Sequence, residues 1–384
     1  MTSVLTEASG PLKGFRVIDM GMLFAGPLIA THLSDLGAEV IKIEHPKGDE
    51  VRKQGKLKNG QSLWWRQVSR NKRFVAIDAS KHEGAEAVRR LIGTADVFVE
   101  NFRPDVKNRL GIGYDDLSKV NPRLVYASIS GFGQDGPYEA RPGFDQIAQG
   151  MGGLMSITGL PGQGPVRVGI PIADLCAGIF CAYGILVALL EREVSGKGQF
   201  VNTSLLQAQI FMLDFQASRW LMNKEVAKQA GNNHPTSIPT GVFKTKDGFF
   251  NIAVTGNKIW ERFVKTVGRE EWLNNPDFAT AAARSKNRDA LNAEIDKALQ
   301  TETSATWVER FNTAGVPCGP IYNIDQVFAD EQVKHLGIAQ GLEKVGKGRI
   351  DYVGQPVVLS RTPSSIKADR KSTRLNSSHG YISY

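Results

Sequence analysis

Cysteine is scarce in this chain, with three residues among 384. Three thiols are too few for the disulfide framework of a small secreted protein. The longest apolar run, from Leu175 to Leu190, is shorter than a membrane span and is interrupted by Gly178 and Gly184. The first residues, MTSVLTEASGPLKG, lack the basic and then apolar order of a signal peptide. We therefore expect a cytoplasmic protein without a membrane partner.

A concentrated positive charge is also missing. The formal net charge is +8, but the lysines and arginines are spread through the sequence without a basic tract or a nucleic-acid motif. We expect no nucleic-acid partner, and small phosphorylated ligands fit this charge better.

What the chain does have is an alternation of strand and helix patterns. Apolar runs predict strands at 17–20, 39–44, 74–78, 95–101, 124–131 and 199–205. Strands alternating with helices indicate an α/β fold with a Rossmann-like, mostly parallel sheet, whose ligands lie at the carboxyl ends of the strands. The pattern from 205 to 222 predicts one long helix. The turn Lys246-Asp247-Gly248, followed by helical patterns, predicts a smaller α+β domain.

The domain boundaries follow from these patterns and from changes in polarity. We expect a large α/β domain over 1–222, a linker over 223–237, a small α+β domain over 238–320, a return linker over 321–345, a return to the large domain over 346–370, and a non-native tail over 371–384.

Two glycine patterns do not carry a nucleotide site. The run from Gly131 to Gly136 matches G-x-G-x-x-G, but Pro137 and Pro142 prevent the helix that a dinucleotide fingerprint requires. Gly21 and Gly26 have phosphate-loop spacing, but no lysine and serine or threonine follow them.

Asp174 stands immediately before the apolar run that ends at Leu190. A helix that is apolar all round is typically buried, and Asp174 has the place of an N-cap. Residue type alone favours a structural cap over a catalytic carboxylate.

Basic residues cluster before the third predicted strand (Arg70, Lys72, Arg73) and after the fourth (Arg103, Arg109). If the sheet gathers them near one edge, they form a candidate polyphosphate site. A solvated basic surface explains the same charges equally well.

Several sequence blocks, in order from about Pro11 to Asp369, together resemble the class III CoA-transferases of CaiB/BaiF type, the group of formyl-CoA and carnitine CoA-transferases. These blocks are LKGFRVIDM, LGAEVIKIEHPKGD, NKR, DVFVENFRP, NPRLVYASISGFGQDGPY and ADLCAGIFCAYGILVALLERE. The resemblance implies an enzyme that moves CoA from an acyl-CoA to a carboxylic acid, with Asp174 as the nucleophile. The intermediates would be an aspartyl mixed anhydride and an aspartyl-CoA thioester, with no cofactor and no metal. A helix N-terminus would keep Asp174 ionised.

The resemblance also implies a CoA-binding set and an interlocked homodimer. The CoA-binding residues carried over are Leu23, Phe24, Asn71, Lys72, Arg73, Asn101, Phe102, Arg103, Arg109, Phe144 and Asp145. Phe24 stands near the position of a glutamine in formyl-CoA transferase, which argues against a formyl-CoA:oxalate activity. Dicarboxylates such as succinate are the acceptors that the family suggests, and Arg141 or Arg167 would hold a second carboxylate.

Two alternatives stay open. One is a racemase of 2-methylacyl-CoA, a chemistry of the same superfamily in which a Gly-His-Asp motif supplies a base. This chain has Gly143-Phe144-Asp145, and phenylalanine cannot act as a base, although His234 in the linker is a substitute candidate. The other is a protein that binds CoA without turnover, with Asp174 as a cap.

Overall fold

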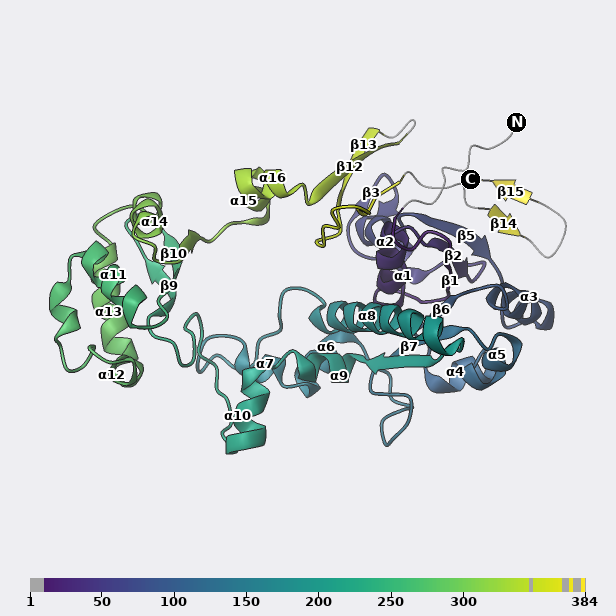
Figure 1. Cartoon of the computed structure of the whole chain (residues 1–384), viewed down its shortest axis with the longest axis horizontal. Helices are drawn as coiled ribbons and strands as arrows, with labels where there is room; N and C mark the ends of the chain where they lie inside the picture. Colours follow the sequence, from purple (N-terminus) through teal and green to yellow (C-terminus); the bar gives the residue numbers. More distant parts are fainter. Residues whose placement is uncertain (1–9, 345–347, 368–372, 376–380, 384) are drawn as a thin grey trace. The chain divides into compact units, whose positions relative to one another are not determined.

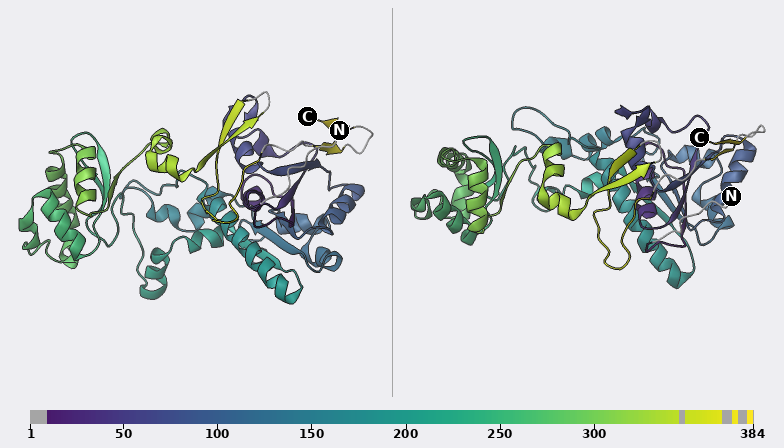
Figure 2. Two further views of the ribbon diagram at one scale, coloured as in Figure 1. Left: turned by 45° about the horizontal axis from the view of Figure 1, so that its top comes forward. Right: turned by 90° about the horizontal axis from the view of Figure 1, so that it is seen from above.

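The computed structural model describes residues 10–344, 348–367, 373–375 and 381–383. The chain forms two compact units, each of which is described by itself (Figures 1 and 2). The first unit comprises 1–154, 167–225 and 334–384, and the second comprises 155–166 and 226–333. The segment 155–166, expected with the large domain, thus belongs to the second unit.

The first unit is built on a twisted sheet with the strand order β15-β14-β5-β2-β1-β6-β7-β8. Its six central strands are β5 (Lys72–Ala76), β2 (Glu39–Glu44), β1 (Arg16–Asp19), β6 (Val97–Glu100), β7 (Val125–Ser130) and β8 (Phe200–Ser204), and all are parallel. The order reverses direction between β1 and β6, as in a doubly wound sheet. The predicted α/β fold with a mostly parallel sheet is therefore confirmed.

Helices cover both faces of this sheet, because side chains alternate between the faces along each strand. Val17, Val97 and Val99 face a core shared with α1 (Ala25–Asp35) and α8 (Ile172–Ser195). Their neighbours Ile18 and Phe98 face a second core with α3 (His82–Ile92) and α5 (Tyr114–Val120). The remaining elements of this unit are α2 (Leu63–Val68), α4 (Pro104–Arg109), α6 (Asp145–Met151), α9 (Leu205–Phe211), α10 (Phe215–Asn223), the hairpins β3 (Leu57–Lys58) with β4 (Gln61–Ser62) and β12 (Ala339–Lys344) with β13 (Gly348–Val353), and the short helix η1 (Glu50–Arg52).

The helix α8 packs against α1, α9, β7 and β8 and ends at Gly196, whose φ of 74° is favourable for glycine. By length and composition α8 would be able to cross a membrane, and half of its apolar window is buried inside the structure. The expectation of a helix buried all round is wrong. One side carries a stripe of exposed apolar side chains, formed by Ile179, Tyr183, Val187, Leu190 and Val194.

The single helix expected over 205–222 is also corrected by the structure. The chain forms α9 and α10 instead, separated by Met212–Asp214, and Asp214 has a φ of 49° and a ψ of −124°. No glycine or proline marks this break in the sequence.

The second unit joins a three-stranded antiparallel sheet to a helical layer. The sheet has the order β11 (Cys318–Pro320), β10 (Phe249–Ala253), β9 (Thr240–Lys244), and the expected hairpin at Asp247-Gly248 joins β9 to β10. Phe250 and Ile252 point into a core with Trp260, Phe263 and Phe311. The helices are α11 (Asn257–Val267), α12 (Ala281–Lys286), α13 (Arg288–Leu299), α14 (Ser304–Thr313), α15 (Ile324–Ala329), the short helix η2 (Glu270–Leu273), and α7 (Leu154–Ile157) and α16 (Glu331–Leu336) at the unit boundaries. Thr303 caps α14, because its side chain accepts from the Thr306 N–H.

Two short strands lie in the segment expected to be a non-native tail. β14 (Thr373–Leu375) pairs in parallel with β5, and β15 (Tyr381–Ser383) pairs antiparallel with β14. The rest of 371–384 lies outside the described residues.

Candidate active site

The loops after β1 and β6 meet at the point where the strand order reverses, which is where open α/β sheets bind ligands. Asn101 ties the two loops together, because its Oδ1 accepts from the Met22 N–H at 2.7 Å and its Nδ2 donates to the Met22 carbonyl at 2.9 Å. A Cβ on Gly21 would lie 2.8 Å from the Gly26 backbone, so this turn needs glycine. Leu23 has a φ of 60° in the same loop. The loop that carries the predicted CoA-binding residues Leu23 and Phe24 is therefore held in place by these contacts.

A buried charge cluster supports this loop from below. Asp19 is fully buried, and its carboxylate lies 2.9 Å from the Lys72 ammonium and 3.6 Å from that of Lys42. Lys72 also donates to the Pro27 carbonyl at 2.7 Å, and Lys42 donates to the Gly21 carbonyl. Burial acts to raise the pKa of Asp19, but the two lysines outweigh it and hold this pKa below its ordinary value. The cluster fixes both ends of the turn between β1 and α1.

The expected gathering of the basic residues at one edge of the sheet is wrong. Arg70 is buried in an ion pair with Asp35, and Arg73 pairs with Glu39 at the first residue of β2. Residues at the start of a parallel strand lie at the amino edge of the sheet, whereas Arg103 follows the end of β6 and lies at the carboxyl edge. Sequence proximity to a strand does not say at which end of the sheet a side chain lies.

Two members of the predicted CoA-binding set are occupied inside the chain. Lys72 is buried in the cluster described above. Asn71 donates to Asp35 and to the Ser365 carbonyl, and its Oδ1 accepts from the Lys367 N–H at 2.6 Å. Both side chains hydrogen-bond to the backbone of other segments of this chain. These bonds do not favour a contact with CoA, which stays a prediction.

Arg73 lies at the amino edge, whereas five of the other predicted contacts lie at the carboxyl edge and Arg109 lies near it. Leu23 and Phe24 are in the turn after β1, Asn101 to Arg103 follow β6, and Arg109 ends α4. Arg103 and Arg109 are exposed and share Asp105 as a distant partner, at 3.6 and 3.8 Å. Phe24 contacts the half-exposed Trp64 edge to face, with ring centroids 6.5 Å apart. The exposed arginines are suited to bind the phosphates of a nucleotide, and the aromatic rings are suited to stack on its base.

Two further residues at this edge were not singled out from the sequence. His45 follows β2 and Asp78 follows β5, and the imidazole Nε2 lies 3.8 Å from the Asp78 carboxylate. The signal that could have found them is their position just after a predicted strand.

Asp174 lies in the first turn of α8, not at its N-cap, which is Pro171. The acidic residue that accepts from this turn is Asp145, whose Oδ1 accepts from the Ala173 N–H at 2.9 Å. Asp145 begins α6, and its Oδ2 accepts from the Gln149 side chain at 2.7 Å. The fully buried Gln149 also binds the Val168 N–H and the Ile170 carbonyl, so it ties α6 to the segment that leads into α8.

Burial raises the pKa of Asp174 from 3.8 to about 7, and the negative charge of Asp145 adds to this shift. The expectation that the helix N-terminus keeps Asp174 ionised is therefore wrong. The physical reason is that burial and the negative charge of Asp145 both disfavour the charged form of Asp174, and they outweigh the helix N-terminus. Two carboxylates in unlike environments, one hydrogen-bonded and one buried with a raised pKa, are typical of an active site.

Two other side chains belong to this site. The Arg167 guanidinium lies 3.8 Å from the Asp145 carboxylate, with its side chain 44% exposed. Phe144, one residue before Asp145, is 62% exposed and so presents its ring to the surface. The site thus combines a nucleophile candidate, a second carboxylate, a cation and an exposed ring.

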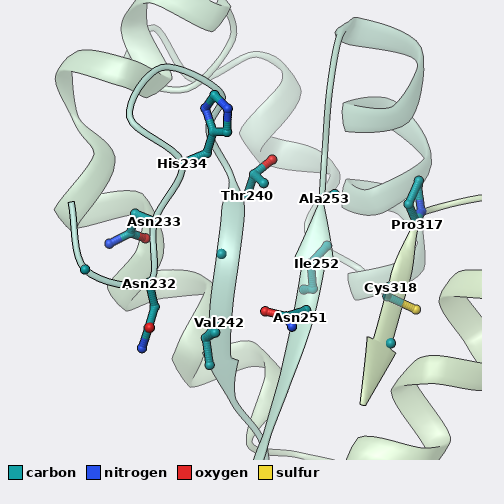
Figure 3. A pocket seen from close by; sticks show the side chains of 13 residues that line it. Asn232, Asn233, His234, Thr240, Val242, Asn251, Ile252, Ala253, Pro317 and Cys318 are labelled. Atoms are coloured by element: carbon teal, nitrogen blue, oxygen red, sulfur yellow. The ribbon is translucent and has the colours of Figure 1, made fainter. Parts of the chain in front are cut away.

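His234 lies in a different place, a cavity of about 570 Å³ within the second unit (Figure 3). Its Nδ1 accepts from the backbone N–H groups of Thr236 and Ser237 at 3.2 and 3.0 Å, which leaves the proton on Nε2. The residues that line the cavity, all of them within the described part of the chain, include no aspartate or glutamate. The cavity therefore does not repeat the arrangement of Asp145 and Asp174.

Residues 12–370 match the model of CoA-transferase family III. This chain belongs to that family, and it is therefore a class III CoA-transferase.

Several characterised relatives are similar over almost the whole chain. Human succinyl-CoA:glutarate CoA-transferase is 35% identical over 91% of this chain and 81% of that protein. Succinate–glutarate CoA-transferase of Agrobacterium fabrum is 37% identical over 95% of this chain and 93% of that protein. Acetyl-CoA:oxalate CoA-transferase of Acetobacter aceti is 39% identical over 92% of this chain and 90% of that protein.

A solved structure shows the same fold. A CaiB/BaiF family protein from Brucella suis superposes with a TM-score of 0.82 at 34% identity, over 93% of this chain and 95% of that protein. The resemblance expected from the sequence is thus confirmed, for the fold as well as for the family.

Proposed function

We propose that this enzyme transfers CoA between carboxylic acids through covalent intermediates on Asp174. The observation that carries the proposal is the carboxylate of Asp174 in the first turn of α8, beside Asp145 and with its pKa raised to about 7. Such a carboxylate is about half ionised at pH 7 and only partly solvated, and its ionised form is suited to attack on a thioester.

The proposed reaction needs only carboxylates and the thiol of CoA. An Asp174 oxygen attacks the thioester carbonyl carbon, the C–S bond breaks, and CoA thiolate leaves a mixed anhydride. The thiolate attacks the aspartyl carbonyl, which releases the donor acid and forms an aspartyl-CoA thioester. The acceptor carboxylate then attacks this thioester to give a second anhydride, and the thiolate attacks the acceptor carbonyl, which frees Asp174. Each step exchanges one acyl bond for another, so no redox cofactor or metal is required.

The same arrangement suggests roles for the neighbouring groups. Asp145 is held by Gln149 and the Ala173 N–H, so it presents a fixed negative charge beside the nucleophile. We assign it a positioning role, because its charge adds to the rise that burial causes in the pKa of Asp174. We place the nucleotide end of CoA at the carboxyl edge of the sheet, where Arg103, Arg109 and the ring of Trp64 are exposed.

We further propose that the acceptor is a short dicarboxylic acid. The human and Agrobacterium relatives are named for succinate and glutarate, and the Acetobacter relative is named for oxalate. The cation that lies beside Asp145, Arg167, supports an acceptor with a second negative charge.

The direct test is to trap the intermediate. Incubation with succinyl-CoA and then hydroxylamine should convert an activated Asp174 ester into a stable hydroxamate, which peptide mass spectrometry locates. A hydroxamate on another residue, or none with several acyl-CoA donors, would contradict the proposal. Deuterium exchange at the acyl α-carbon would then indicate the racemase, whereas CoA binding without exchange would indicate binding alone.

The pH profile tests the role of Asp145. Because the carboxylate form of Asp174 attacks, kcat/KM for the acyl-CoA should fall about tenfold per pH unit below about 7 and level off above it. Asp145→Asn keeps an oxygen for the Ala173 N–H but removes the charge. The acid limb should therefore move to lower pH, without reaching the ordinary aspartate range, because burial is the larger cause.

Initial rates between pH 5 and 9 measure this limb, and the exposed Asp105→Asn serves as the control that should leave it in place. A limb unmoved or raised by Asp145→Asn would show that Asp145 does not control the nucleophile.

We also propose that the enzyme is a homodimer, interlocked as the family resemblance implies. The support in this structure is the exposed apolar stripe on α8, because soluble chains rarely leave such a face uncovered. Leu190 and Val194, for example, are 73% and 91% exposed.

Charge on this stripe should weaken the dimer. Val187→Glu/Leu190→Glu is expected to raise the dimer dissociation constant about 100-fold or more, since charges would replace apolar contacts at the interface. Light scattering over a dilution series measures the mass. The control, Val120→Glu, changes an equally apolar exposed residue at the end of α5 and should leave the mass unchanged. A monomeric wild-type protein would refute the proposal.

A further inference from the structure

The guanidinium of Arg167 makes only a weak contact with the described part of its own chain. Its contact with Asp145, at 3.8 Å, is an ion pair beyond hydrogen-bond distance. Asp145 does not depend on this contact, since Gln149 and the Ala173 N–H already donate to its two oxygens. The guanidinium, with five donors in a planar fork, is therefore available for a carboxylate ligand.

The position of Arg167 relates it directly to the nucleophile. One oxygen of Asp145 binds the backbone of Ala173, the residue before Asp174, and the other lies beside Arg167. The carboxylate of Asp145 thus links the backbone of Ala173, the residue before the nucleophile, to the guanidinium. Asp174 and Arg167 therefore share Asp145 as a neighbour, and an acceptor that reacts at Asp174 comes close to this cation.

Electrostatics requires a cation here. An acceptor anion that approaches Asp174 also approaches Asp145, and like charges at short distance are unfavourable. Within the described part of the chain, Arg167 is the one basic side chain in an ion pair with either aspartate. Arg141, the other arginine considered from the sequence, instead stacks on the ring of Tyr138 at 3.6 Å.

We infer that Arg167 is the specificity residue that binds the distal carboxylate of the acceptor diacid. The inference rests on the proposed transferase function and adds to it the group that distinguishes diacids from monoacids. It does not involve the acyl-CoA half of the reaction, in which Asp174 is acylated.

The test compares two acceptors that differ only in the distal carboxylate, glutarate and butyrate, with acetyl-CoA as the donor. In Arg167→Gln, kcat/KM for glutarate should fall about 10- to 100-fold, the loss expected for charge-assisted hydrogen bonds at a half-exposed site. The value for butyrate should stay within about threefold, because butyrate has no group for Arg167 to bind. If butyrate turnover is too slow to follow, its competition against glutarate supplies the binding constant. Arg167→Lys should recover only part of the loss, because an ammonium lacks the planar fork.

Two controls separate this inference from the function on which it rests. Arg141→Gln should keep the wild-type preference for glutarate. Hydroxamate formation on Asp174 from acetyl-CoA should be unchanged in Arg167→Gln, since no acceptor takes part. Equal losses on both acceptors, no loss on glutarate, or a loss in Arg141→Gln instead would overturn the assignment. Failure of wild-type Asp174 to form the hydroxamate would overturn the transferase mechanism, and the assignment with it.

Discussion

Asp174→Asn is expected to lower CoA transfer by at least about 10³-fold and to give no hydroxamate at this position. The amide is nearly the same size as the carboxylate but is neutral and a far weaker nucleophile, so binding should survive while acylation does not. Single-turnover assays with labelled acyl-CoA measure the effect. Activity within tenfold of the wild type would show that Asp174 is not the nucleophile and would favour the binding or racemase alternatives.

The stability of the same variant shows whether the loss is chemical. The pKa of Asp174 is about 7 in the folded chain and 3.8 ordinarily, so the folded state holds the proton more tightly. Between these two pKa values, rising pH therefore lowers the free energy of unfolding. Above pH 7 the variant avoids this cost, and we expect it to be about 1–3 kcal/mol more stable than the wild type. A variant that unfolds more readily at pH 8 would contradict this account.

Lys72→Met is expected to lower the free energy of unfolding by about 3 kcal/mol, because it leaves the buried Asp19 with Lys42 as its nearest cation, at 3.6 Å. The Pro27 carbonyl also loses its donor. Urea denaturation at fixed protein concentration gives the shift in the midpoint. Lys119→Met, an exposed lysine on α5, should change the midpoint very little.

The double variant tests the cause of this effect. Asp19→Asn removes the charge that Lys72 balances, so Asp19→Asn/Lys72→Met should lose less stability than the two single changes added together. Purely additive losses would mean that Lys72 stabilises the loop through packing and its bond to the Pro27 carbonyl, without a contribution from the charge of Asp19. A midpoint for Lys72→Met equal to that of Lys119→Met would refute the role of the cluster.

The pattern of apolar runs in the sequence predicted most of the strands, because strands whose faces are buried in a sheet consist largely of apolar residues. The strand expected over 39–44 is β2 residue for residue, and the hairpin at Asp247-Gly248 joins β9 to β10. Helix ends marked by glycine, such as Gly196, were likewise readable from sequence. The break between α9 and α10 at Asp214 was not readable from the sequence, since no glycine or proline marks it.

The order of sequence blocks indicated the family and drew attention to Asp174, whereas the tertiary structure decided which side chains surround it. Asp145 reaches the first turn of α8, and Arg167 reaches Asp145, where Gln149 ties α6 to the segment before α8. Strand pairing likewise placed Arg73 at the amino edge of the sheet and buried Lys72 against Asp19. The sequence gives the chemical type of each side chain. Its neighbours and its burial depend on long-range packing, and the neighbours and the burial set its charge state and its role.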